Sequence, residues 1–140
     1  LNKATGETIW QLSEGGSAQV ISSSGDEVFY SSENAVMVVD MASGKLKHKY
    51  PMPKNMGIPT GSAVYNSWLV FGLSEGPVVL MEKDSGKWVD TFFPGRGISA
   101  RPSLEQGTND IYIVSNQANL YKLSLSKRDR SKEFLWGNNR

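Results

Sequence analysis

The stretch Leu1-Asn2-Lys3-Ala4-Thr5-Gly6-Glu7-Thr8-Ile9-Trp10 opens a pattern that returns along the chain. It consists of an acidic or amide residue, two variable positions, Thr or Ser, Gly and a polar residue, and it recurs at 40–45 and 82–87. A weaker copy at 122–127 has Ser126 in place of Gly. From Gly6 to Gly44, Gly86 and Ser126 the steps are 38, 42 and 40 residues. A period of this size indicates a repeat architecture.

Each copy is expected to form a tight turn between two strands. Glycine adopts a positive φ at little steric cost, and a preceding Thr or Ser can bond the local backbone. The runs 35–39 and 77–81, which are rich in β-forming residues, precede the turns at Gly44 and Gly86. The repeating unit is therefore predicted to be strand, turn, strand.

The expected strands form three groups of four along the chain. They lie at 18–22, 27–31, 35–40 and 46–50, then at 62–65, 68–73, 78–82 and 87–93, and then at 100–104, 110–115, 120–125 and 133–136. Four short strands per forty residues favour β-propeller blades over a sandwich. The prediction is an all-β fold with a half blade at 1–13, including a strand at 8–12, and four-stranded antiparallel blades at 17–52, 59–94 and 98–138.

Composition excludes several classes of function. The chain has 140 residues, a net charge of +1 and no cysteine, so it has no disulfide and no thiolate ligand or nucleophile. No run of apolar residues is long enough to cross a membrane, and the charge distribution is not typical of nucleic-acid binding. The chain begins inside a repeat, and apolar strands lie at both limits. We therefore expect it to belong to a larger ring, completed by other residues of the same polypeptide or by a second chain.

Leu1–Trp10 resembles the tryptophan-docking repeat of the PQQ-like, eight-bladed β-propellers, roughly Ala-x-Asp-x-x-Thr-Gly-x-x-x-Trp. Trp10 stands at the docking position, which His48, Asp90 and Arg130 occupy in the later copies. The resemblance implies a noncatalytic scaffold that binds other proteins in an extracytoplasmic, periplasmic assembly, as in the BamB-like members of the family.

Two other functions follow from the same resemblance. The chain could be a fragment of a quinoprotein dehydrogenase, but it lacks the Cys-Cys pair and the acid-rich calcium loop of those enzymes. A carbohydrate-binding propeller would need exposed aromatic side chains such as Trp88 or Trp136. We expect no cofactor, no metal ion and no catalytic residue in this chain.

His48 is the only histidine, and no orienting acid or further metal ligand accompanies it. It is therefore interpreted as a structural substitute for the docking Trp. Lysines beside it, at 45, 47 and 49, are typical of an exposed edge strand.

A protein interface is predicted in the connections between blades. Met and apolar residues in Pro-restrained loops form adaptable contact surfaces, although the same residues could simply seal neighbouring blades. The candidate interface residues are Met52, Met56, Ile58, Phe93 and Arg96.

Trp10 is expected to pack between successive blades, with its indole N–H on a backbone carbonyl. Truncating a buried indole costs about 3–5 kcal/mol. Trp10→Ala should lower the free energy of unfolding by this amount in urea denaturation. Acrylamide quenching that finds all four tryptophans equally open to water would contradict the prediction.

Overall fold

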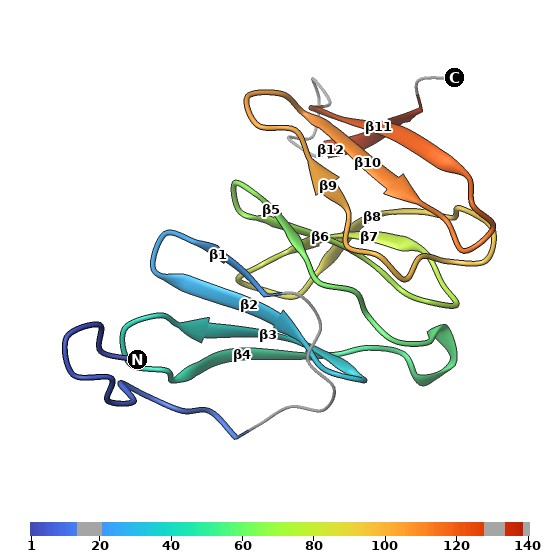
Figure 1. Cartoon of the computed structure of the whole chain (residues 1–140). Helices are drawn as coiled ribbons and strands as arrows, with labels where there is room; N and C mark the ends of the chain where they lie inside the picture. The colour runs from blue at the N-terminus through green and yellow to red at the C-terminus, as the bar shows by residue number, and fades with distance from the viewer. Residues whose placement is uncertain (14–20, 128–133, 139–140) are drawn as a thin grey trace.

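The computed structural model describes residues 1–13, 21–127 and 134–138. It holds three four-stranded antiparallel sheets that follow one another along the chain (Figure 1). The first sheet contains β1 (Ser22–Ser24), β2 (Glu27–Ser31), β3 (Ala35–Asp40) and β4 (Leu46–Pro51). The second contains β5 (Ala63–Tyr65), β6 (Trp68–Gly72), β7 (Val78–Glu82) and β8 (Trp88–Phe92), and the third contains β9 (Ser103–Leu104), β10 (Asp110–Val114), β11 (Leu120–Lys127) and β12 (Phe134–Asn138). A single turn of 3-10 helix, η1 (Lys54–Met56), lies between the first two sheets.

Strand order within each sheet equals sequence order, so every connection inside a sheet is a hairpin. The first two sheets also share an irregularity, because the pairing of β3 with β4 shifts between Val38 and Val39 and that of β7 with β8 shifts between Leu80 and Met81. Val38 of the first sheet corresponds to Leu80 of the second, and Val39 corresponds to Met81. The prediction of four-stranded antiparallel units is confirmed, and the first two of them share this irregularity at equivalent positions.

Some details of the strand prediction are wrong. The strand predicted at 18–22 continues to Ser24, and the chain then reverses in a two-residue turn at Gly25 and Asp26, because Gly25 supplies a φ of 61°; residues 18–20 lie outside the described residues. The strand predicted at 100–104 is limited to Ser103–Leu104. Residues 8–12 do not form a strand, since no described strand pairs with them. Ser126 is not a turn residue either, because β11 continues through it and pairs it with Leu135.

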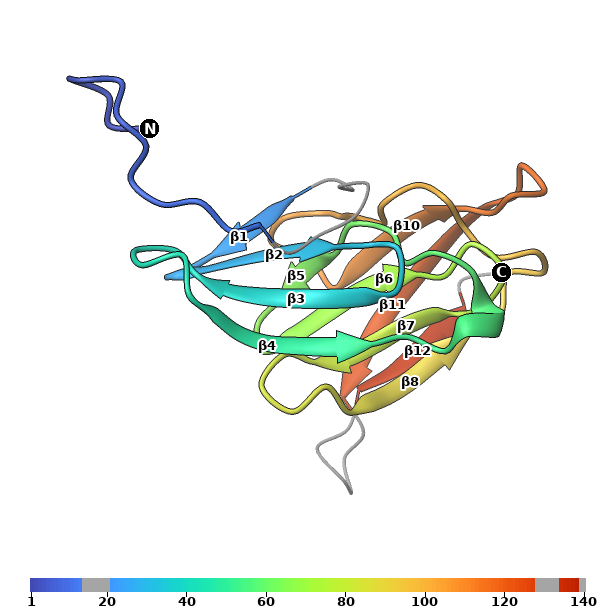
Figure 2. The same cartoon turned by 90° about the horizontal axis from the view of Figure 1, so that it is seen from below.

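The hydrophobic core lies between the sheets, which stack face to face (Figure 2). The central strands β3, β6 and β7 are buried along nearly their whole length. Between the first and second sheets the core consists of Phe29, Val36, Val38, Met52, Leu69, Phe71, Leu73, Val79 and Met81. Between the second and third it consists of Ala63, Val70, Val78, Leu80, Ile98, Ile111, Ile113, Leu123 and Leu125.

The three predicted glycine turns share one geometry. Gly6, Gly44 and Gly86 have φ values of 73°, 70° and 72°, as predicted. Their N–H groups donate to the carbonyl four residues earlier, at 2.7, 2.9 and 2.8 Å respectively. The repeat register set by these glycines is therefore confirmed.

An aromatic ring covers two of these turns. The indole of Trp10 lies on Gly44, and its Nε1 donates to the carbonyl of Met41 at 2.8 Å. The expected backbone acceptor is thus present. The indole is only half-buried, however, so Trp10→Ala should cost about 1–3 kcal/mol rather than the amount for full burial.

The equivalent ring in the second copy is Tyr50, and the assignment of this role to His48 is wrong. Tyr50 lies on Gly86, and its hydroxyl donates to the carbonyl of Lys83 at 2.7 Å. Burial, with a contribution from nearby carboxylates, raises the pKa of Tyr50 to about 12, so the phenol remains a donor at neutral pH. His48 instead stacks on Tyr50, with ring centroids 5.4 Å apart.

Alanine substitutions at the three glycines should separate backbone strain from ring contact. A Cβ at Gly6 would meet nothing within 4 Å, whereas at Gly44 or Gly86 it would lie 2.4 or 2.3 Å from the ring. Gly6→Ala should cost about 1 kcal/mol through its positive φ, and the other two about 2–4 kcal/mol because the ring must also move. Equal losses in urea denaturation would contradict the docking geometry.

A buried carboxylate joins the first two sheets. Glu27 on β2 is 3% exposed, and its oxygens accept hydrogen bonds from Lys47 of β4, at 2.8 Å, and from Lys83 of the second sheet. Burial acts to raise the pKa of Glu27, but the hydrogen bonds from Lys47 and Lys83 outweigh it and hold the pKa below its ordinary value. The ionised carboxylate is thus the form that bridges the sheets.

Glu27→Gln should lower the free energy of unfolding at pH 7 by about 1.5–3 kcal/mol, because two charge-assisted hydrogen bonds are lost. A depressed pKa stabilises the folded chain above the ordinary value of 4.5, and this stabilisation is lost as the pH falls through the folded-state pKa. The difference between wild type and variant should therefore shrink below about pH 4.5. The exposed Glu33→Gln is the control; a Glu27 effect that is independent of pH would refute the ion pair.

Candidate functional site

Both connections between sheets lie at one end of the sheets, together with the β6–β7 and β10–β11 turns, on the right-hand side of Figure 1. We call this surface the loop face and define it by residues 52–59, 73–77, 93–99 and 115–119. It includes both connections between sheets and the β6–β7 and β10–β11 turns. Loops of all three sheets therefore contribute to one surface.

Hydrogen bonds between neighbouring loops join this face into a single platform. Ile58 N–H donates to Ser74 Oγ at 2.8 Å, and Ser74 N–H donates to the Ile58 carbonyl at 3.0 Å. The side-chain amide of Asn116 donates to the carbonyls of Ser74, at 2.9 Å, and Arg96, at 3.2 Å. Each loop is thus held by a loop of the adjacent sheet.

Two glycines allow the loops to approach so closely. Gly57 and Gly97 have φ values of 79° and 77°. A Cβ would lie 2.1 Å from Ser74 Oγ in the first case and 2.5 Å from the carbonyl oxygens of Leu73 and Ser74 in the second. Both sites therefore require glycine for backbone conformation and for space.

The five predicted interface residues lie in this region but do not share one environment. Met52 is 6% exposed and belongs to the core, and Met56 is half-buried against the same core. Ile58 and Phe93 are 42% and 68% exposed, and Arg96 is exposed as well. The methionines therefore seal the first two sheets, whereas Ile58, Phe93 and Arg96 are available to a partner.

The other residues that the sequence singled out contribute less to an exposed site. Trp88 is half-buried against the core between the first two sheets, so its ring is not an open stacking surface. The side chain of Trp136 and all of Arg130 lie outside the described residues. Asp90 is half-buried on β8.

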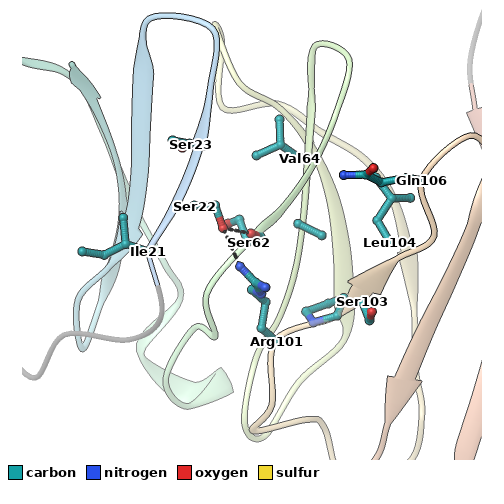
Figure 3. Close-up of a pocket in the computed structure, with 11 residues that line it drawn as sticks. Ile21, Ser22, Ser23, Ser62, Val64, Arg101, Ser103, Leu104 and Gln106 are labelled. Atoms are coloured by element: carbon teal, nitrogen blue, oxygen red, sulfur yellow. Dashed lines mark hydrogen bonds between the residues drawn. The ribbon is translucent and has the colours of Figure 1, made fainter. Parts of the chain in front are cut away.

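A second candidate site is a hollow on the inner strands β1, β5 and β9, which lie next to one another (Figure 1). Its volume is about 410 Å³. Figure 3 shows Arg101 pointing toward Ser22, and its Nη1 donates to Ser22 Oγ at 3.2 Å. The Ser22 hydroxyl in turn donates to the carbonyl of Ser62. Each of the three sheets thus contributes one polar group, on or next to its inner strand, to one chain of hydrogen bonds.

No residue of this hollow stands out in the sequence by itself. The available signal was the repeat itself, because Ser22 and Ser62 are 40 residues apart and Arg101 follows 39 residues later. Residues at this spacing meet when the units stack side by side.

In the part of the chain that the structure describes, no three His, Asp or Glu side chains lie together as a metal site would require. No described helix is long and apolar enough to span a membrane.

No family model matches the chain, and no curated protein matches it. Several solved structures, however, match the fold of this chain. The computationally designed protein Ika4 is 12% identical over 96% of this chain and 93% of its own, with a TM-score of 0.72. The computationally designed protein Ika8 is 13% identical over 84% of this chain and 38% of its own, with a TM-score of 0.65.

The N-terminal domain of Nup159 is 10% identical over 86% of this chain and 29% of its own, with a TM-score of 0.55. The sheets of this protein are β-propeller blades. At such low identities the likeness shows the fold alone. The eight-bladed ring and the PQQ-like resemblance stay predictions.

Asn116 should be the side chain that holds the second and third blades together at the loop face. Asn116→Ala removes two hydrogen bonds at an exposed site and should cost about 1 kcal/mol. Hydrogen exchange should quicken at Ile98 N–H, which donates to the Leu73 carbonyl beside this contact. Asn119→Ala is the matched control; an equal effect from both variants would contradict the assignment.

Proposed function

We propose that this chain is a noncatalytic propeller scaffold that binds other proteins through the loop face, in an extracytoplasmic assembly. The observation that carries the proposal is the platform itself. Loops of three blades are fixed to one another by hydrogen bonds, and they present Ile58, Phe93 and Arg96 to solvent. A rigid surface loses little conformational entropy on binding.

The chemistry of the exposed residues supports a protein partner. Phe and Arg are enriched in the cores of protein interfaces. Next to them, the exposed residues 116–119 offer amide groups that can form hydrogen bonds at the rim of a contact. The coarse part of the proposal, a propeller scaffold, agrees with the fold; the partner and the extracytoplasmic location are inferred from the resemblance of the repeats to BamB-like proteins.

Site-specific photo-crosslinking in cells that produce the protein tests the proposal. A benzoylphenylalanine at position 93 should give discrete adducts with another protein, and Arg96→Glu should reduce them. Position 87 lies in the β7–β8 turn at the opposite end of the blade, where Lys87 is exposed.

The same probe at position 87, and the charge reversal Lys87→Glu, are therefore the matched controls. Adducts of equal yield at both positions, or none at position 93, would refute the role of the loop face. Recovery of the protein only from the cytoplasmic fraction would refute the location.

A further inference from the structure

We propose that the hollow on the inner strands binds an oxyanion group, either a carboxylate or a phosphate, through Arg101. The hollow is lined by Ile21, Ser22, Ser23, Ser62, Ala63, Val64, Arg101, Pro102, Ser103, Leu104 and Gln106. Arg101 is the only charged residue among the described residues that line it. The other polar groups are hydroxyls and one amide, which can donate hydrogen bonds to an anion without repelling it.

The guanidinium of Arg101 has unused capacity at this site. It carries five N–H groups, of which one donates to Ser22 Oγ. Within the described residues Arg101 forms no ion pair with a carboxylate. Because only Nη1 donates to Ser22, the other N–H groups of the planar guanidinium can form a two-point contact with an oxyanion.

Ser62 supplies a second, independent observation. The residue is 1% exposed, and its hydroxyl has no hydrogen-bond partner among the described residues. A buried hydroxyl without a partner is unfavourable, and a bound ligand or water commonly satisfies it. Ser62 lies beside Ser22 among the residues that line the hollow (Figure 3), so its buried hydroxyl is the group that we expect to rotate toward an anion held by Arg101.

Among the described residues around the hollow, no carboxylate pairs with Arg101. Glu105 follows Leu104 but lines a neighbouring hollow, where it accepts a hydrogen bond from the Tyr112 hydroxyl at 3.3 Å. The apolar side chains Ile21, Val64 and Leu104 form the remaining wall, which suits the carbon part of a small organic acid. This site is separate from the loop face, so its failure would not affect the proposed scaffold function.

Calorimetric titration of the 140-residue chain with inorganic phosphate, and separately with succinate, tests the inference. Saturable binding of both identifies the shared oxyanion group, and binding of one alone identifies its source. Arg101→Met should weaken binding about tenfold or more, and Arg101→Lys should restore it only in part, because the two-point contact is lost. Lys87→Met removes a positive charge at an exposed site elsewhere and should leave binding unchanged within about twofold.

Ser62→Ala separates ligand binding from a structural role. Because this hydroxyl has no described partner, its removal should weaken binding without lowering the melting temperature of the unliganded chain. Failure of both anions to bind, or equal losses in Arg101→Met and Lys87→Met, would overturn the proposal. So would a crystal structure in phosphate that shows water alone at Ser62 and no anion beside Arg101.

Discussion

The contact between an aromatic ring and the glycine turn of the next repeat positions the outer strands of this protein. Trp10 covers Gly44, and Tyr50 covers Gly86. In both cases the ring also donates a hydrogen bond to the carbonyl three residues before the glycine, from an indole N–H or a phenol O–H. The glycine meets two requirements at once, since it adopts the positive φ of the turn and leaves room for the ring. This explains why the turn residue is constant while the docking residue varies.

The local part of the repeat could be predicted from the sequence, because turn geometry depends on a few adjacent residues. Gly6, Gly44 and Gly86 were therefore placed correctly. The docking residue depends on tertiary structure and was not. Residues four and six positions after Gly44 lie on the same face of a strand, so His48 and Tyr50 were equally eligible from spacing alone. The bulge opposite Val38 and Val39, which the sequence did not reveal, changes the register of this strand and accompanies the selection of Tyr50.

The difference between local sequence and tertiary packing also decides how much of each candidate site could be predicted. Met52 and Ile58 belong to one connection of similar composition, yet Met52 enters the core and Ile58 does not, because η1 lies between them and redirects the chain. Burial within a loop depends on its neighbours, so composition could indicate the region but not the exposed members. The hollow depends on three inner strands that are short and only weakly patterned, so only the forty-residue spacing could have suggested it.

Blades of similar sequence could pack against one another in the wrong order. The three blades differ at one position that favours the observed order. Glu27, Trp68 and Asp110 occupy the same register position, opposite Asp40, Glu82 and Ser124. Glu27 bonds Lys83 of the next blade, whereas Asp110 pairs with Lys122 of its own blade at 3.0 Å.

A buried carboxylate gains little stability over an apolar residue, but without its lysine it becomes strongly unfavourable. Lys47 of the first blade itself satisfies one oxygen of Glu27, so the first blade packs best against a neighbour that presents a second cation at the position of Lys83. Of the three units, the second supplies this lysine in its turn, directly after Glu82, while the equivalent position in the first is Met41 and that in the third is Leu125. We infer that the ion pair favours this order of the first two blades, while the ring on Gly86 holds the same two blades together at their outer strands.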